Sequence, residues 1–140
     1  DRINARSTWH RLGRAREESG DVSGAMECYE RAGTHGAEVP RMLHGLGMVD
    51  RLERYVSERG EPVLRRWWGQ YLEAHGRLDP ALKQYELAED TVAVVRVHCM
   101  RQRYAEAEEA LGEGGNAAAA YYLATQYQAL GRPKEAIAMF

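Results

Sequence analysis

The chain has 140 residues, of which 44% are hydrophobic and 29% are charged, a balance typical of one globular domain and unlike that of a disordered chain. Nineteen basic residues against twenty-one acidic ones give a formal net charge of -2, and the two signs are interspersed, which disfavours a nucleic-acid-binding protein. The longest apolar run, residues 117–124, is far shorter than the roughly 20 residues that a membrane-spanning helix needs. Cys28 and Cys99 follow no Cys-x-x-Cys pattern and indicate reduced, buried thiols in an intracellular setting.

Almost every segment shows the three-to-four-residue periodicity of an amphipathic helix. Gly20-Asp21 and Gly115-Asn116 each place a glycine that ends one helix before a side chain that can cap the next. Asp79-Pro80 offers a cap followed by a proline at the first helical position, and Arg132-Pro133 begins a helix after Gly131. The predicted helices, in chain order, are 3–18, 22–33, 38–44, 48–59, 62–75, 79–89, 91–101, 104–112, 116–130 and 133–140.

The segment 91–99 is the ambiguous one, because Val92, Val94, Val95 and Val97 favour a strand by intrinsic propensity. A lone strand among helices would have no partner for its backbone polar groups. We therefore expect a helix there.

A repeat is present within this series of helices. The tetratricopeptide pattern places W-x-x-L-G in one helix, then A-x-x-x-F and a further alanine in the next. The first copy consists of Trp9, Leu12, Gly13, Ala25, Tyr29 and Ala32, and the second of Trp68, Gly69, Leu72, Ala81, Tyr85 and Ala88. The third consists of Leu123, Ala124, Tyr127, Ala136 and Phe140, and a fainter copy holds Ala107 and Leu111. The repeat predicts an all-α fold, a tetratricopeptide-like α-solenoid in which antiparallel helix pairs stack into a right-handed superhelix.

Small residues have a packing role in this pattern. Glycine and alanine let the paired helices approach closely, and the aromatic residue fills the space to the neighbouring helix. Gly20, Gly76 and Gly131 each lie five residues before a signature alanine, where the two helices of a pair turn back on one another. Trp67 and Trp68 are adjacent and cannot both point into one core. We expect Trp68 inside its repeat, and Trp67 either between repeats or at a possible contact with a partner protein.

The repeats are unevenly spaced, because the first two copies are separated by an extra helix pair, about 38–59, that lacks the signature. We nevertheless expect residues 1–140 to form a single helical repeat segment. The chain opens without a methionine and stops inside an apolar helical pattern, which indicates a fragment of a longer polypeptide.

Residues that could perform chemistry are present but not in a productive pattern. The histidines form no metal-binding pair, the acidic run from Glu106 to Glu113 suits a solvated helix face, and Gly112–Asn116 lacks the lysine and hydroxyl of a phosphate loop. The sequence therefore predicts a protein that is not an enzyme and has no catalytic residue, metal or cofactor. His10 and Arg14 stand where clamps for carboxyl-terminal tails need lysine and asparagine, which disfavours capture of such tails.

Several non-repetitive stretches resemble one family. Thr34–Leu43, Arg66–Gly76, Tyr85–Asp90 and Val95–Cys99, in this order, are similar to the helical region of the hundred-and-forty-kilodalton subunits of intraflagellar transport complex A. The stretch Glu38–Leu43 carries the most weight, because no generic repeat demands it.

This resemblance implies a protein–protein interaction scaffold in retrograde ciliary or flagellar transport and in the ciliary entry of membrane proteins. It implies other complex A subunits as direct partners, the dynein motor and membrane-protein cargo as indirect ones, and no contact with nucleic acid or insertion into the membrane. The implied location is the cilium or flagellum and the basal body, on the cytoplasmic side. The alternatives are a peptide-binding tetratricopeptide adaptor and a related coat-like transport subunit.

Overall fold

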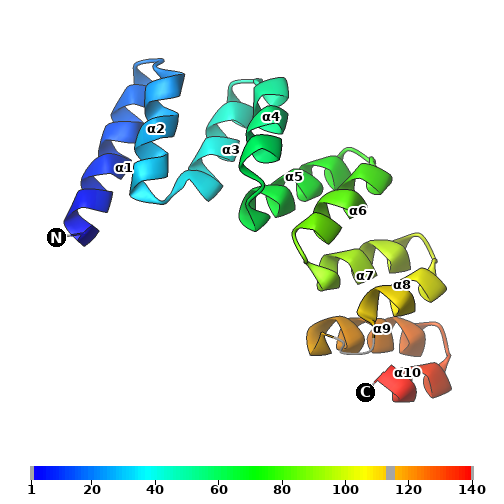
Figure 1. The fold of residues 1–140 in the computed structure, drawn as a ribbon. Helices are drawn as coiled ribbons and strands as arrows, with labels where there is room; N and C mark the ends of the chain where they lie inside the picture. The colour runs from blue at the N-terminus through cyan, green and yellow to red at the C-terminus, as the bar shows by residue number, and fades with distance from the viewer. Residues whose placement is uncertain (1, 113–115, 140) are drawn as a thin grey trace. The chain divides into compact units, whose positions relative to one another are not determined.

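The computed structural model of the chain describes residues 2–112 and 116–139, so the aromatic expected at Phe140 and the loop glycines Gly114 and Gly115 lie outside the described residues. All regular secondary structure within these ranges is helical, which confirms the all-α, tetratricopeptide-type prediction (Figure 1). The helices are α1 (Arg2–Glu18), α2 (Val22–Ala32), α3 (His35–Gly45), α4 (Val49–Arg59), α5 (Pro62–Ala74), α6 (Leu78–Leu87), α7 (Thr91–Met100), α8 (Tyr104–Leu111), α9 (Ala117–Ala129) and α10 (Pro133–Met139).

Capping side chains start several of these helices. The carboxylate of Asp21 accepts a hydrogen bond from the Gly24 amide at 3.0 Å, and the Asn116 side chain accepts one from Ala119 at 3.1 Å. Asp90 caps α7 in the same way, through the Ala93 amide at 3.2 Å. This cap helps to explain why the valine-rich segment is helical despite its strand propensity.

Several predicted boundaries differ from the structure, all but one of them by one or two residues. Helix α3 begins at His35, three residues before the predicted start, and includes Pro40 in its interior. Helix α6 begins at Leu78, so Asp79 is not its cap but lies in its first turn. Pro80 follows in that same turn, where the missing N–H has no intrahelical acceptor in any case.

The helices form two compact units, residues 1–64 and residues 65–140. In the first unit α1 packs on α2, α2 on α3 and α3 on α4. Its core contains Ala25, Tyr29, Val39, Leu43 and Leu52.

In the second unit α7 packs on α6, α8 and α9, and α9 packs on α10. A buried cluster in this unit contains Val95, Ala107, Leu123, Ala124, Tyr127 and Ala136. That both units belong to one continuous repeat segment stays a prediction.

Two of the helix pairs that carry the repeat signature, α1–α2 and α5–α6, have a glycine on the first helix that lies close against a tyrosine ring on the second. A Cβ atom added at Gly13 would lie 2.8 Å from Cε1 of Tyr29, and one added at Gly69 would lie 2.7 Å from Cε1 of Tyr85. Only a hydrogen atom fits at such distances. The two glycines therefore set the separation of α1 from α2 and of α5 from α6.

The predicted turn glycines adopt the backbone conformation that a tight reversal needs. Gly20, Gly76 and Gly131 have φ values of 85°, 75° and 73°, in the left-handed region that glycine enters without a steric cost. Each follows the first helix of its pair, and the chain then reverses into the second helix.

Replacing Gly69 with alanine should destabilise the chain, because the new methyl group would collide with the Tyr85 ring. The ring has little freedom to move, since its hydroxyl is bonded to Glu73. We expect a loss of about 1–3 kcal/mol in the free energy of unfolding, measured by urea denaturation. Gly45→Ala is the matched control, because a Cβ atom there meets nothing within 4 Å. It should raise stability by about 0.5 kcal/mol. Equal effects of the two variants would contradict the close-packing account.

Candidate functional site

The signature alanines face inward in all three copies of the repeat. Ala25 and Ala81 are 0% exposed and Ala136 is 1% exposed, and the following alanines Ala32 and Ala88 are also buried. Leu123 of the third copy is fully buried as well.

Two residues of the first copy lie at the edge of this packing. Trp9 is half-buried, and the guanidinium of Arg31 lies 4.7 Å from the centre of its ring. Leu12, which we expected in the core, is 38% exposed. Successive helical residues point about 100° apart, so Gly13 takes the face of α1 against α2 and Leu12 points away from it. The face of α1 that carries Leu12 therefore stays partly open to solvent.

The two adjacent tryptophans of α5 differ in burial, with Trp68 the more buried of the two. Trp68 is 6% exposed, whereas Trp67 is half-buried. Their rings stack on Tyr71, with centroid distances of 6.0 Å from Trp67 and 4.8 Å from Trp68, and Tyr71 lies 4.2 Å from the His75 ring. The helix thus carries a continuous set of contacting aromatic rings. A partner contact through Trp67 stays a prediction.

A tyrosine–glutamate–arginine cluster, which sequence reasoning missed, ties three successive helices together in the first unit. The hydroxyl of Tyr29 on α2 donates a hydrogen bond to Glu17 on α1 at 2.7 Å. Arg41 on α3 donates two further hydrogen bonds to the same carboxylate, at 2.7 and 3.1 Å. The bidentate geometry is the strongest form of this ion pair.

The same cluster recurs in the second unit. Tyr85 on α6 donates to Glu73 on α5 at 2.8 Å, and Arg96 on α7 donates to that carboxylate at 2.5 and 2.8 Å. A sequence signal for it did exist. In both copies the glutamate lies four residues after the close-approach glycine, as the pairs Gly13 and Glu17, and Gly69 and Glu73, show.

The hydroxyl groups of the two other buried tyrosines, Tyr55 and Tyr127, also donate to glutamates. Tyr55 donates to Glu30 at 3.0 Å, with Arg59 at 3.3 Å from that carboxylate. The hydroxyl of Tyr127 donates to Glu108. Each of the four buried tyrosines in the described residues therefore satisfies its hydroxyl with a glutamate. Glu108, which we assigned to a solvated helix face, has this structural contact.

The electrostatics of the clusters keep them charged at neutral pH. Hydrogen bonds from Arg41 and Arg96 lower the pKa values of Glu17 and Glu73, respectively. Burial, and then the bond to glutamate, raises the pKa of the Tyr85 hydroxyl. The tyrosine therefore stays protonated and donates, while the carboxylate stays ionised and accepts.

Side chains capable of metal or redox chemistry are dispersed. In residues 2–112 and 116–139, no three histidine, cysteine or acidic side chains are grouped so that they could hold a metal ion. Cys28 and Cys99 are both buried and unpaired with one another. Within the same ranges, none of the helices combines the length and the apolar character that crossing a bilayer requires.

A family model for the TPR domain of intraflagellar transport proteins 140 and 172 matches residues 1–140. The match agrees with the resemblance to the helical region of complex A subunits and with the all-helical, tetratricopeptide-type structure. A helical domain of this type is a protein-interaction scaffold, and its family indicates interaction with other intraflagellar transport proteins and a place in the cilium.

The hydroxyl of Tyr85 should contribute measurably to stability. In Tyr85→Phe the ring still packs on Gly69, but Glu73 loses a hydrogen-bond donor. We expect the free energy of unfolding to fall by about 1–3 kcal/mol, the range for a hydrogen bond to a charged group. Tyr104→Phe is the control, since the Tyr104 hydroxyl has no hydrogen bond in the described structure and its ring contact with Tyr127 is retained. An equal loss in the control would contradict the assigned role.

Acid should weaken the domain through the same clusters. The pKa of Glu73 lies below its ordinary value of 4.5, so its contribution to stability is complete above that pH and is lost as the pH falls through the folded-state pKa. Thermal unfolding of Glu73→Gln should therefore depend less on pH below about 4.5 than unfolding of the parent chain. Glu53→Gln, which alters an exposed glutamate of α4, should leave the parent's acid dependence unchanged. If the Glu73 variant keeps the full acid dependence, this assignment fails.

Proposed function

The chain belongs to the TPR-domain family of intraflagellar transport proteins 140 and 172, and we propose that it is an assembly scaffold of intraflagellar transport complex A that serves retrograde transport and the ciliary entry of membrane proteins. The observation that carries this proposal is the family match across residues 1–140. The stretch Glu38–Leu43 supports the assignment to complex A, because it resembles those subunits at positions that the repeat leaves open.

The surface of the helices supports a scaffold role. Large apolar side chains remain exposed in both units, and they offer apolar surface that a partner protein would bury on binding. They include Leu46 at 54%, Val63 at 45%, Leu87 at 46%, Met100 at 53% and Leu130 at 50% exposure. Meanwhile the tyrosine–glutamate–arginine clusters hold the helices in a fixed arrangement. A scaffold needs both properties, because rigid presentation lowers the entropic cost of association.

The proposed direct partners are other complex A subunits. The dynein motor and membrane-protein cargo would then be reached through the assembled complex rather than through this domain alone. The corresponding location is the cilium or flagellum and the basal body, on the cytoplasmic side of the membrane.

The proposal can be tested in ciliated cells that lack the full-length protein. Restoring it without residues 1–140 should fail to recover other complex A subunits by co-precipitation. Transport proteins should then accumulate at the ciliary tip, and membrane proteins should be depleted from the cilium. Normal co-precipitation and normal transport with this deletion would contradict the proposed function.

Trp67 provides a finer test of the same surface. Trp67→Ala in the full-length protein should weaken co-precipitation, and it should lower the unfolding temperature of the domain no more than Trp9→Ala does, because both rings are half-buried and both contact their own repeat. Trp9→Ala is the matched control, since Trp9 is half-buried too but lies against Arg31 of its own repeat. Equal binding by both variants and the parent would remove Trp67 from the interface.

A further inference from the structure

A groove on the second unit is lined by side chains from α6, α7 and α8. It encloses about 630 Å³, a volume large enough for several side chains of a peptide. Val94 and Tyr85 lie at its buried base, with Ala110 half-buried beside them. The base is therefore apolar and fits a small apolar side chain.

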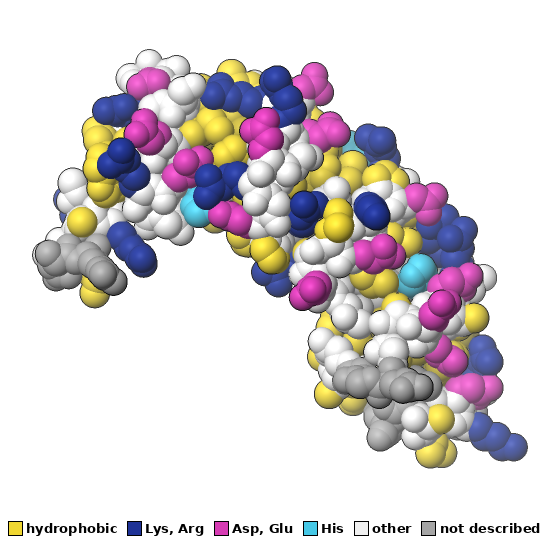
Figure 2. Space-filling view, viewed as in Figure 1, with side chains coloured by type: hydrophobic (Ala, Val, Ile, Leu, Met, Phe, Trp, Pro, Cys, Tyr) yellow, Lys and Arg dark blue, Asp and Glu magenta, His cyan; other side chains and the backbone are white. Residues whose placement is uncertain are grey.

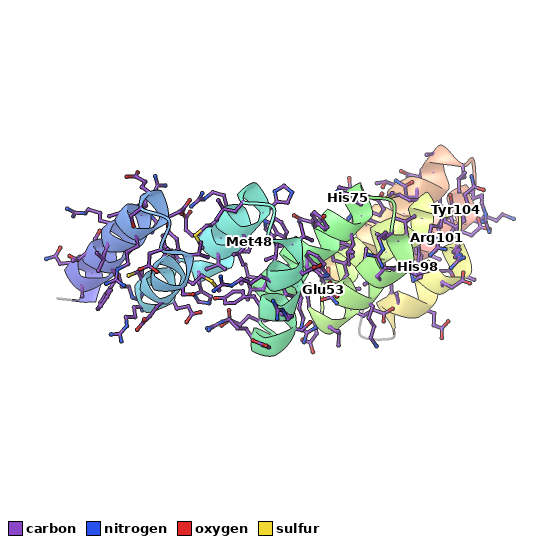
Figure 3. All side chains as sticks on the ribbon, turned by 90° about the horizontal axis from the view of Figure 1, so that it is seen from above. Met48, Glu53, His75, His98, Arg101 and Tyr104 are labelled. Carbon is purple, nitrogen blue, oxygen red and sulfur yellow. The ribbon has the colours of Figure 1, made fainter. Side chains whose placement is uncertain are left out.

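His98 also contributes to the lining of the groove. It lies on α7 (Figure 3), and its Nδ1 atom is buried and has no hydrogen-bond partner in the described residues. An unsatisfied buried nitrogen is costly.

The rim of the groove is acidic on both sides. Glu86 and Glu89 come from α6 and the turn after it, Asp90 precedes α7, and Glu106 and Glu109 come from α8. Among the described residues that line the groove, none is a lysine or an arginine. Arg101, labelled in Figure 3 at the end of α7, donates to Asp79 at 2.5 Å and does not line the groove. Figure 2 shows acidic side chains gathered beside a histidine over this part of the molecule.

These carboxylates differ from those that hold the fold together. Glu17, Glu30, Glu61 and Glu73 are each within salt-bridge distance of an arginine. No arginine or lysine lies within salt-bridge distance of Glu86, Glu106 or Glu109 in the described residues. An apolar base surrounded by uncompensated negative charge is complementary to a basic segment.

The backbone at Glu89 distinguishes the second copy of the repeat from the first. Glu89 lies eight residues after Ala81, and the same position of the first copy, eight residues after Ala25, is Gly33. Both adopt the left-handed conformation, with φ of 57° at Glu89 and 75° at Gly33. Glycine adopts it readily, whereas a residue with a side chain does so at a cost. The second copy thus carries a carboxylate on the groove rim at a position where glycine would suit the backbone better.

We propose that this groove binds a basic segment of a partner protein, with lysine or arginine side chains against the acidic rim and one small apolar side chain on the base. The inference deepens the proposed scaffold function, on which it rests for the nature of the partner. The charge is opposite to that of clamps for acidic carboxyl-terminal tails, so an acidic segment would be repelled.

Binding can be measured by fluorescence anisotropy of the 140-residue chain with a short labelled peptide of arginine, leucine and glycine. The peptide should bind, and binding should weaken as salt is raised, because rim charges act through screened attraction. A peptide with glutamate in place of arginine should not bind. No binding of the arginine peptide, or equal binding of both peptides, would overturn the proposal.

A charge-matched pair of variants separates the groove from general surface charge. Glu106→Gln with Glu109→Gln removes two exposed rim carboxylates, and the affinity should fall about fivefold to tenfold, as expected for two exposed ion pairs. Glu53→Gln with Glu58→Gln removes two exposed carboxylates from α4 and should change the affinity by less than about twofold. Equal loss in both variants would show non-specific attraction and overturn the site. Competition by millimolar calcium in the parent alone would identify a cation site and would also overturn it.

Glu89→Gly tests the groove without risk of unfolding. The variant should unfold at a higher temperature than the parent, because glycine suits the left-handed turn. It should nevertheless bind the arginine peptide more weakly. Higher stability with unchanged binding would remove Glu89 from the site.

The outcome of the peptide-binding experiments can be distinguished from the outcome of the co-precipitation experiment. If the rim variants lose the peptide while the full-length protein fails to co-precipitate complex A subunits, the groove stands and the proposed function falls. If the rim variants bind as the parent does while co-precipitation persists, only the groove falls.

Discussion

The contact between a glycine on one helix and a tyrosine ring on the next determines how closely the helices of the first two signature pairs can pack. Gly13 against Tyr29 and Gly69 against Tyr85 leave no room for a methyl group. The ring would still be free to slide along the glycine if its hydroxyl were unbound. The bond from tyrosine to glutamate removes that freedom, and the arginine from the third helix fixes the glutamate in turn. Packing, a hydrogen bond and an ion pair thus act on the same few atoms.

This arrangement has a consequence for the acidic residues. A carboxylate that accepts from a buried tyrosine and an arginine is held in one place and is largely neutralised, as Glu17 and Glu73 are. Such residues stabilise the fold but offer little to a partner. The four glutamates around the α6–α8 groove, Glu86, Glu89, Glu106 and Glu109, have the opposite character, because they are exposed and no arginine of the described residues lies within salt-bridge distance of them. The same residue type therefore serves structure in one place and recognition, as we propose, in another.

The candidate site was only partly predictable from the sequence. The inward alanines and the close-approach glycines follow from the spacing of the repeat, because small residues recur where helices touch. The partners Arg41 and Arg96 could not be identified, because they come from the next helix and their reach depends on how that helix is placed. Leu12 was predicted to be buried but is 38% exposed. Its position in the repeat is usually buried, but burial depends on a neighbouring helix covering that face, which periodicity alone does not specify.

The sequence by itself determined the helices, their turns and the pairing of the first helix of each repeat with the second. These features depend on interactions between residues close in the chain: caps such as Asp21, left-handed glycines such as Gly20, and the three-to-four-residue spacing of apolar side chains. It also carried the resemblance to complex A subunits. Only the tertiary structure decided which charges are paired and which line the groove, because the contacts that join successive helices connect residues far apart in the chain, such as Glu73 and Arg96, which are 23 positions apart. Local periodicity contains no information about the distance between such side chains.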